Sequence, residues 1–208
     1  MMYRAPSFPR ARASSHSALG RFVLAGPREA VGLAVILISC FVALPRSLAD
    51  RPKANEYQVK AAYLSNFAKF VRWSPVAAAS QPTFNVCVLG QDPFGPALDA
   101  AVAGETVDNL PLEAKRITAP VEAGACRILY IGPSENDQLK TVLATVEKTS
   151  ALTVSDIPKF TKQGGMIEFV LDGNRVRFEV NLTAAQHAGL NLSSDLLKLA
   201  VAVQRGPE

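Results

Sequence analysis

The chain has 208 residues, a formal net charge of +4 and a pI of about 9.1, which at first suggests a basic protein. The excess positive charge lies in residues 1–49, which hold six of the 22 basic residues but only Glu29 of the 18 acidic residues. Residues 50–208 therefore hold 16 basic and 17 acidic residues, a formal charge of about −1, and give no reason to expect a nucleic-acid partner.

An apolar run over residues 30–44 is the first predicted element. It follows several arginines, precedes small residues at 47 and 49, and is shorter than the roughly 20 residues that span a bilayer. We predict a signal peptide over residues 1–49 and export of the rest of the chain. An uncleaved membrane anchor and a lipoprotein, for which Cys40 would carry the lipid, are the alternatives.

Residues 50–208 are long enough for one domain with a single core. A helix is predicted over residues 56–73, where apolar side chains recur at helical spacing. These side chains are Val59, Tyr63, Phe67, Phe70 and Val71, while Lys60, Lys69 and Arg72 lie elsewhere on the helical wheel. After a loop at 75–82, we expect a strand over 84–89 and a short helix over 94–102.

The middle of the domain shows a strand, helix, strand order. Residues 112–117 have the mixed polarity of an edge strand, and 127–131 are almost all apolar, as in a strand covered on both faces. Ser134 is predicted to cap the following helix, which carries apolar positions from 139 to 146, and residues 151–154 form the next strand.

A β-hairpin is predicted over residues 165–182, because the period changes to two around the turn Asp172-Gly173-Asn174. Thr183 is expected to cap a short helix that ends before Gly189, and Ser193 or Ser194 to cap a last helix. The predicted fold class is α/β, with one domain whose mixed β-sheet is flanked by helices and followed by a C-terminal β-hairpin and two short helices.

Cys87 and Cys126 remain once a leader that contains Cys40 is removed. An even number of cysteines in an exported chain favours a disulfide, and both lie in or beside short strand-like runs. Two buried free thiols are the alternative.

Motifs for catalysis are scarce in residues 50–208. His187 is the single histidine, and the nucleophile-elbow, zinc-protease and P-loop patterns are all absent. The segment from Gly90 to Gly95 resembles a phosphate loop, but Pro93 removes a backbone donor, so we interpret it as a strand-to-helix turn. Asp156 is interpreted as a turn or cap residue and His187 as a surface or cap residue. We therefore predict no catalytic, cofactor or metal site.

A candidate binding face lies on the return strand of the hairpin. Arg175 and Arg177 are two residues apart, so their guanidinium groups would lie side by side and could bind a carboxylate or a phosphate. The alternative is a solvated strand face on which Glu168 and Glu179 balance the two arginines.

Several runs of the sequence closely resemble the YfiR-like family. They cover residues 56–201 in the family's order and lie at 59–73, 86–90, 92–95, 126–131, 152–156, 164–167, 174–181 and 196–200. The resemblance implies a periplasmic domain without catalytic activity, and it matches Cys87 and Cys126 to the positions of the family's disulfide.

The resemblance also implies a function. The named family member represses an inner-membrane diguanylate cyclase by binding its periplasmic sensory domain, which lowers cyclic-di-GMP and biofilm formation, and an OmpA-like outer-membrane lipoprotein sequesters it. Family members also form dimers, and some accept small molecules. We therefore expect a regulatory binding protein, with Arg175, Arg177, Glu168 and Glu179 as the candidate face, and a periplasmic sensor of small anions as the alternative.

Overall fold

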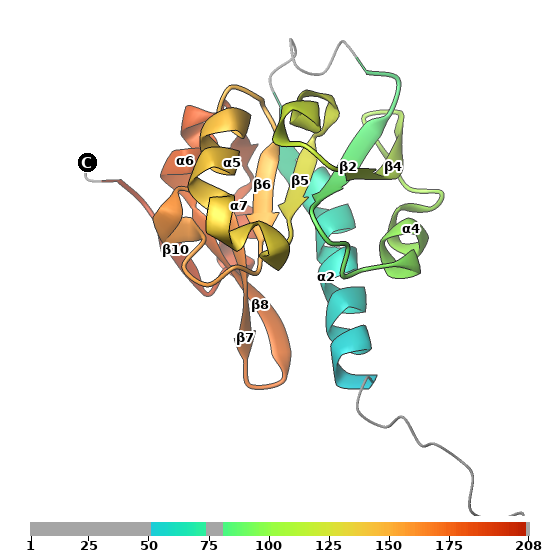
Figure 1. Ribbon diagram of the computed structural model, residues 1–208, viewed down its shortest axis with the longest axis horizontal. Helices are drawn as coiled ribbons and strands as arrows, with labels where there is room; N and C mark the ends of the chain where they lie inside the picture. Colours follow the sequence, from blue (N-terminus) through green and yellow to red (C-terminus); the bar gives the residue numbers. More distant parts are fainter. Residues whose placement is uncertain (1–50, 74–80, 207–208) are drawn as a thin grey trace, which may run out of the picture. The chain divides into compact units, whose positions relative to one another are not determined.

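The structure, a computed structural model, describes residues 51–73 and 81–206 (Figure 1). The predicted leader over residues 1–49, with Cys40, and most of the predicted loop at 75–82 lie outside these described residues. Within the described part of the chain, no helix is both long and apolar enough to span a bilayer.

The first described element, helix α2 (Arg51–Phe70), differs from its prediction at its end and on its buried face. It stops before strand β1 (Val71–Arg72), which pairs with β9 (Asn191–Leu192) in a small antiparallel sheet. Val59 is 39% exposed, whereas Lys60 is only 3% exposed. The expected placement of Val59 inside and Lys60 outside was therefore wrong, because a charge network described below holds Lys60 inside.

The main sheet has eight strands in the order β10-β8-β7-β6-β5-β2-β4-β3. The parallel strands are β2 (Phe84–Leu89), β4 (Leu110–Ile117), β5 (Ile128–Ile131), β6 (Leu152–Ser155) and β7 (Ile167–Asp172). Strand β8 (Arg175–Asn181) returns antiparallel to β7, β3 (Thr106–Val107) is antiparallel to β4, and β10 (Ala202–Gln204) is parallel to β8. The mixed sheet and the hairpin are both confirmed.

Helices cover both faces of this sheet (Figure 1). Helix α2 and helix α4 (Pro96–Val102) pack on one face, together with residues of α6 (Leu182–His187) and α7 (Ser194–Leu199). Helix α5 (Leu139–Val146) packs on the other face, with the 3-10 helices η1 (Pro120–Ala125) and η3 (Thr161–Gln163). The predicted α/β class is confirmed.

Side-chain alternation along the strands builds the two cores. In β2, Val86 and Val88 belong to the core on the α2 face, whereas Cys87 and Leu89 belong to the core on the α5 face. Successive strand residues point to opposite faces, so a strand covered on both sides is mostly apolar on both. All six residues of β2 are buried, and Asn85, the one polar side chain among them, donates its amide to the Ala125 carbonyl.

Two predicted caps were wrong, whereas the edge strand predicted over residues 112–117 is confirmed. Strand β3 pairs only with Leu110 and Pro111 of β4, so the later residues of β4 have no strand outside them in the described part of the chain. Ser134 lies in the 3-10 helix η2 (Pro133–Gln138), and α5 begins only at Leu139. Ser134 does not cap α5, because its hydroxyl accepts a hydrogen bond from the Gln91 N–H (2.9 Å). Helix α6 is capped by Asn181, which accepts from the Ala184 N–H (3.0 Å), while Thr183 accepts from the Gly206 N–H (2.7 Å).

Other local predictions are confirmed. Ser193 caps α7 by accepting a hydrogen bond from the Leu196 N–H (3.2 Å). Gly189 follows α6 with a φ of +74°, the left-handed conformation that favours glycine after a helix. The turn before α4 is built by Asp92, whose side chain accepts from the Phe94 N–H (2.7 Å) and the Gly95 N–H (3.3 Å).

Candidate functional site

The hairpin β7–β8 extends beyond its neighbours in the sheet. Strand β6 pairs only with Ile167 and Glu168 of β7, and β10 pairs only with residues 179–181 of β8. The rest of the hairpin is therefore a two-stranded ribbon whose outer edges have no strand partner among the described residues (Figure 1). Unpaired edges of this kind are available for contact with another chain.

The four predicted face residues lie on this hairpin but do not form one cluster of charges. Arg175 is exposed, and its Nη2 lies 3.9 Å from Asp172 Oδ2. Arg177 is half-buried, and its buried Nε has no hydrogen-bond partner among the described residues. Glu168 and Glu179 are cross-strand neighbours. The Glu168 carboxylate is buried and accepts from the backbones of Lys159 (2.8 Å) and Thr161 (3.1 Å), so it does not balance the arginines.

Exposed apolar side chains gather near the same hairpin. Leu171 in β7 is 58% exposed, and Leu199 and Val201 at the end of α7 are 55% and 50% exposed. The Val201 N–H donates to the Phe178 carbonyl in β8 (2.9 Å), which places this C-terminal segment beside the hairpin. Isolated exposed apolar residues are ordinary, but several beside an open strand edge are typical of an interaction surface.

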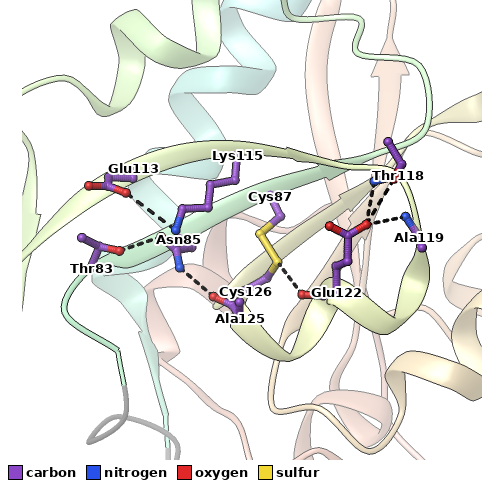
Figure 2. Close-up of a disulfide and its surroundings, with 10 residues drawn as sticks. All are labelled: Thr83, Asn85, Cys87, Glu113, Lys115, Thr118, Ala119, Glu122, Ala125 and Cys126. Atoms are coloured by element: carbon purple, nitrogen blue, oxygen red, sulfur yellow. Dashed lines mark hydrogen bonds and ion pairs between the residues drawn. A yellow bond between two sulfur atoms is a disulfide. The ribbon is translucent and has the colours of Figure 1, made fainter.

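The predicted disulfide joins Cys87 in β2 to Cys126, and the two Cα atoms are 5.8 Å apart (Figure 2). Cys126 caps the end of η1, and only Arg127 separates it from β5. Both cysteines are buried in the core on the α5 face. The bond therefore fixes the η1–β5 junction to the interior strand β2.

Hydrogen bonds support the same junction (Figure 2). The Asn85 amide donates to the Ala125 carbonyl (2.7 Å), two residues before Cys87 in β2. Glu122 accepts from the Ala119 N–H (2.8 Å) and the Thr118 N–H (3.1 Å), and these backbone donors hold the pKa of its carboxyl group below the usual value. Several independent contacts thus order the chain around the disulfide.

A second polar cluster, centred on Asp156, lies between α2 and the carboxyl ends of β5 and β6. Asp156 Oδ1 accepts from the Tyr130 hydroxyl (2.6 Å), and Asp156 Oδ2 accepts from Lys60 Nζ (2.6 Å) and the Tyr57 hydroxyl (3.0 Å). Lys60 Nζ also pairs with Glu56 at 2.5 Å. The cluster links the first helix to two strands that come much later in the sequence.

The Asp156 cluster lies where open α/β sheets often bind ligands, but its groups are already engaged with one another. Both carboxylate oxygens have donors and the ammonium group of Lys60 has two carboxylate partners. Burial, followed by the charge of Asp156, raises the pKa of both Tyr57 and Tyr130, so both hydroxyls remain protonated donors. The arrangement supports the packing of α2 rather than a reaction.

This cluster was not predicted from the sequence, because Asp156 was interpreted as a turn or cap residue. Its side chain serves neither role and instead accepts hydrogen bonds from residues about 100 positions earlier. Lys60 was the one available sign of the cluster. It lies on the buried face of the helix, together with Ala61 and Leu64. A lysine at a core position requires a buried carboxylate partner, but the sequence does not say which one.

Other described polar groups are not arranged for metal binding. Across residues 51–73 and 81–206, no three side chains of the His, Cys, Asp and Glu types are grouped to hold a metal ion. His187 is exposed and lines a cavity of about 600 Å³ between α5, α6 and the C-terminal segment. Neither Arg175 nor Arg177 lines that cavity.

Comparison with known proteins identifies the family. Residues 57–201 match the model of the YfiR/HmsC-like family, which covers most of the chain. The Cys87–Cys126 disulfide and every strand of the main sheet except β10 (Ala202–Gln204) lie within this matched region. The chain therefore belongs to the YfiR/HmsC-like family.

Solved structures show more distant similarity. A conserved domain protein from Vibrio cholerae O1 biovar El Tor is 9% identical with a TM-score of 0.45, and the match covers 58% of this chain and 54% of that one. The ABC domain from Streptococcus pneumoniae, solved with L-Trp, is 12% identical with a TM-score of 0.48, covering 69% of this chain and 60% of that one. The match thus spans between half and two thirds of each relative, and neither likeness carries an argument about function.

Proposed function

We propose that this protein is an exported, non-enzymatic regulator that binds the periplasmic sensory domain of a membrane-bound diguanylate cyclase and inhibits it. Membership of the YfiR/HmsC-like family supports this proposal. A leader over residues 1–49 would deliver the domain of residues 50–208 to the periplasm. The expected outcome in the cell is lower cyclic-di-GMP and less biofilm.

One structural observation carries the proposal. The hairpin β7–β8 has open strand edges, carries Leu171 and lies beside the segment with Leu199 and Val201, and each of these three side chains is at least half exposed. A partner strand could pair with the open backbone while these side chains bury apolar surface against the partner. Arg175, at the tip of the ribbon, would contribute charge recognition, and Arg177 and Glu179 would lie next to the contact on the same strand.

Inhibition of this kind needs no chemical step. If the regulator binds the inactive conformation of the partner more tightly than the active one, the partner's equilibrium shifts toward inactivity. A difference in binding free energy of about 1.4 kcal/mol changes the ratio of the two states tenfold. A few buried apolar contacts at the hairpin are sufficient for an effect of this size.

The experiment that tests the proposal is an affinity pull-down with tagged protein from periplasm and solubilised membranes. The expected result is recovery of a membrane cyclase with a periplasmic domain, and loss of that recovery in the variant Leu171→Ser/Leu199→Ser. Val121→Ser is the matched control, since Val121 is 78% exposed but lies in η1, outside the hairpin. Recovery that is equal for all three proteins would contradict the hairpin as the binding surface.

An OmpA-like outer-membrane lipoprotein is a further expected partner, because the resemblance implies that such a protein sequesters the regulator. We expect it to compete with the cyclase for the free regulator. A second copy of the chain is also an expected partner, and sedimentation analysis would detect such a homodimer. A monomer at all tested concentrations would remove the dimer from the proposal.

A second candidate function is a periplasmic sensor of small anions. The observation that favours it is the buried Arg177 Nε, which has no acceptor among the described residues. An unpaired buried donor on a guanidinium group could be satisfied by a carboxylate or phosphate ligand. The test is a thermal shift on adding candidate anions that disappears in Arg177→Ala, and an unchanged shift in that variant would exclude this strand as the site.

A further inference from the structure

Arg127 is buried at the opposite end of β5 from the Asp156 cluster. It directly follows the disulfide residue Cys126 and precedes β5 (Ile128–Ile131). The backbone N–H of Arg127 donates to the Asn85 carbonyl (2.9 Å), and its carbonyl accepts from the Leu152 N–H (2.8 Å). Arg127 is therefore fixed between β2 and β6, and its side chain starts from a rigid backbone.

The guanidinium group of Arg127 lacks a partner in the described part of the chain. Arg127 is only 5% exposed, and its Nη2 is buried with no hydrogen-bond partner among the described residues. Residues 74–80, which lead into Gln81 beside this group, contain no acidic residue. A buried cation without an anion is costly, so the burial of Arg127 points to a ligand that supplies the missing charge.

Arg127 also lines a pocket of about 220 Å³. The other lining residues include Gln81, Gly124, Lys148, Thr149 and Ser150, and no acidic residue is among those that line it. Lys148 supplies a second positive charge and the two hydroxyl residues supply polar groups. Burial lowers the pKa of Arg127, but a guanidinium group remains charged at physiological pH.

We propose that this pocket binds a small tetrahedral oxyanion of the phosphate or sulfate class. The fork of Arg127 would donate to two oxygens, and Lys148 would pair with the remaining charge from the turn after α5. The site is distinct from the hairpin surface, so this inference does not rest on the proposed function. It adds a ligand that stabilises the η1–β5 junction beside the Cys87–Cys126 disulfide.

The test measures anion binding by calorimetry and thermal unfolding, with protein produced from the full-length chain. Inorganic phosphate is titrated at constant ionic strength against sodium chloride, and sodium acetate is the planar comparison anion. We expect saturable binding and a higher Tm with phosphate, and a weaker response to acetate. A phosphate response no larger than the chloride response would overturn the site, and equal affinity for acetate would overturn the tetrahedral class.

Variants identify the residues involved. Lys148→Gln should weaken phosphate binding about five- to tenfold through loss of one charge-assisted contact, and Arg127→Met should abolish it. Lys140→Gln is the matched control, because Lys140 is also exposed and lies in α5 but does not line the pocket. Equal weakening by Lys140→Gln and Lys148→Gln would show general charge screening and overturn the proposal, even if Arg127→Met failed to fold.

Glycerol 3-phosphate separates the two sources of such a group. Tighter binding of inorganic phosphate would identify a free ion as the ligand, and tighter binding of the ester would identify a phosphoester. Both results support the pocket when they depend on Lys148. If both Lys148→Gln and Arg127→Met bind either compound with the affinity of the original protein, the anion binds elsewhere and the assignment is overturned.

Discussion

Lys60 and Arg127 are both almost fully buried, with 3% and 5% of their surface exposed, yet their surroundings differ. Lys60 contacts two carboxylates, those of Glu56 and Asp156, at the carboxyl end of the parallel strands. Arg127 lies at the amino end of β5, on the other face of the sheet, and no described carboxylate is paired with it.

This difference separates a structural charge from a charge that is available for a ligand. Burying an ion costs several kcal/mol unless a partner compensates it. Around Lys60 the domain supplies the partners itself, and they connect α2 to the sheet. Around Arg127 the domain instead supplies a rigid junction, a disulfide and a second cation, Lys148, and leaves the anionic position open.

The largest expected effect is at Asp156. The variant Asp156→Ala leaves Lys60 with one carboxylate and removes the acceptor of two tyrosine hydroxyls, so the free energy of unfolding should fall by about 4–5 kcal/mol. Urea unfolding measures this value, with the exposed Asp137→Asn as the control. A loss below about 1 kcal/mol, as for a surface charge, would contradict the structural role of the cluster.

The disulfide beside Arg127 should contribute nearly as much. Cys87 and Cys126 are 39 residues apart, so the double variant Cys87→Ser/Cys126→Ser should lose about 3–4 kcal/mol in the chain-entropy model. Non-reducing mass spectrometry confirms the bond, and urea unfolding with and without reductant measures the loss. No change on reduction would show that the η1–β5 junction is held by packing alone.

The tyrosines of the Asp156 cluster predict an alkaline loss of stability. Burial and the charge of Asp156 raise the folded-state pKa of Tyr130 above the unfolded value of about 10. The stabilisation is therefore complete below pH 10 and falls as the pH rises above it, by about 1.4 kcal/mol per pH unit for each such group. Between pH 9 and pH 11, the free energy of unfolding should fall less steeply with pH in Tyr130→Phe than in the original protein. An equal pH dependence in the two proteins would contradict this.

The smallest expected effect is in the exposed ion pairs of Arg116. This side chain bonds to Asp92 (2.8 Å) and Asp99 (2.7 Å), and the hydrogen bond from Arg116 lowers the pKa of Asp99. The contribution of Asp99 is present above pH 4 and is lost as the pH falls through its lowered pKa. Asp99→Asn should cost less than about 1 kcal/mol, and less still in high salt. If Asp99→Asn lowered the free energy of unfolding as much as Asp156→Ala, solvent exposure would not explain the difference between the Arg116 ion pairs and the Asp156 cluster.

Patterns within a segment allowed much of the fold to be predicted. The alternation in β7 and β8, the turn at Gly173 and the Ser193 cap depend on neighbouring residues, and all three are confirmed. Strand β10 and the β1–β9 pair were not predicted, because two- and three-residue strands form only through partners that are distant in sequence. The caps at Ser134 and Thr183 failed because tertiary contacts engage both hydroxyls.

The sites were less predictable than the fold. The even number of cysteines and their strand-like surroundings favoured the Cys87–Cys126 disulfide, and the sheet does bring the two strands together. The Asp156 cluster joins residues 96 and 99 positions apart, so no local pattern could show it. Arg127 belongs to an apolar strand-like run, and its lack of a partner is visible only once the surrounding fold is known.

The comparison of Lys60 and Arg127 is tested most directly by giving both cations the same apolar replacement. In phosphate-free buffer, Lys60→Met should lower the free energy of unfolding by about 3 kcal/mol, because it leaves Asp156 buried without its cation. Arg127→Met should be nearly neutral or stabilising, and should lose the stabilisation that phosphate gives to the original protein. Equal destabilisation by the two replacements in phosphate-free buffer would show that Arg127 already has a structural partner and would contradict the open site.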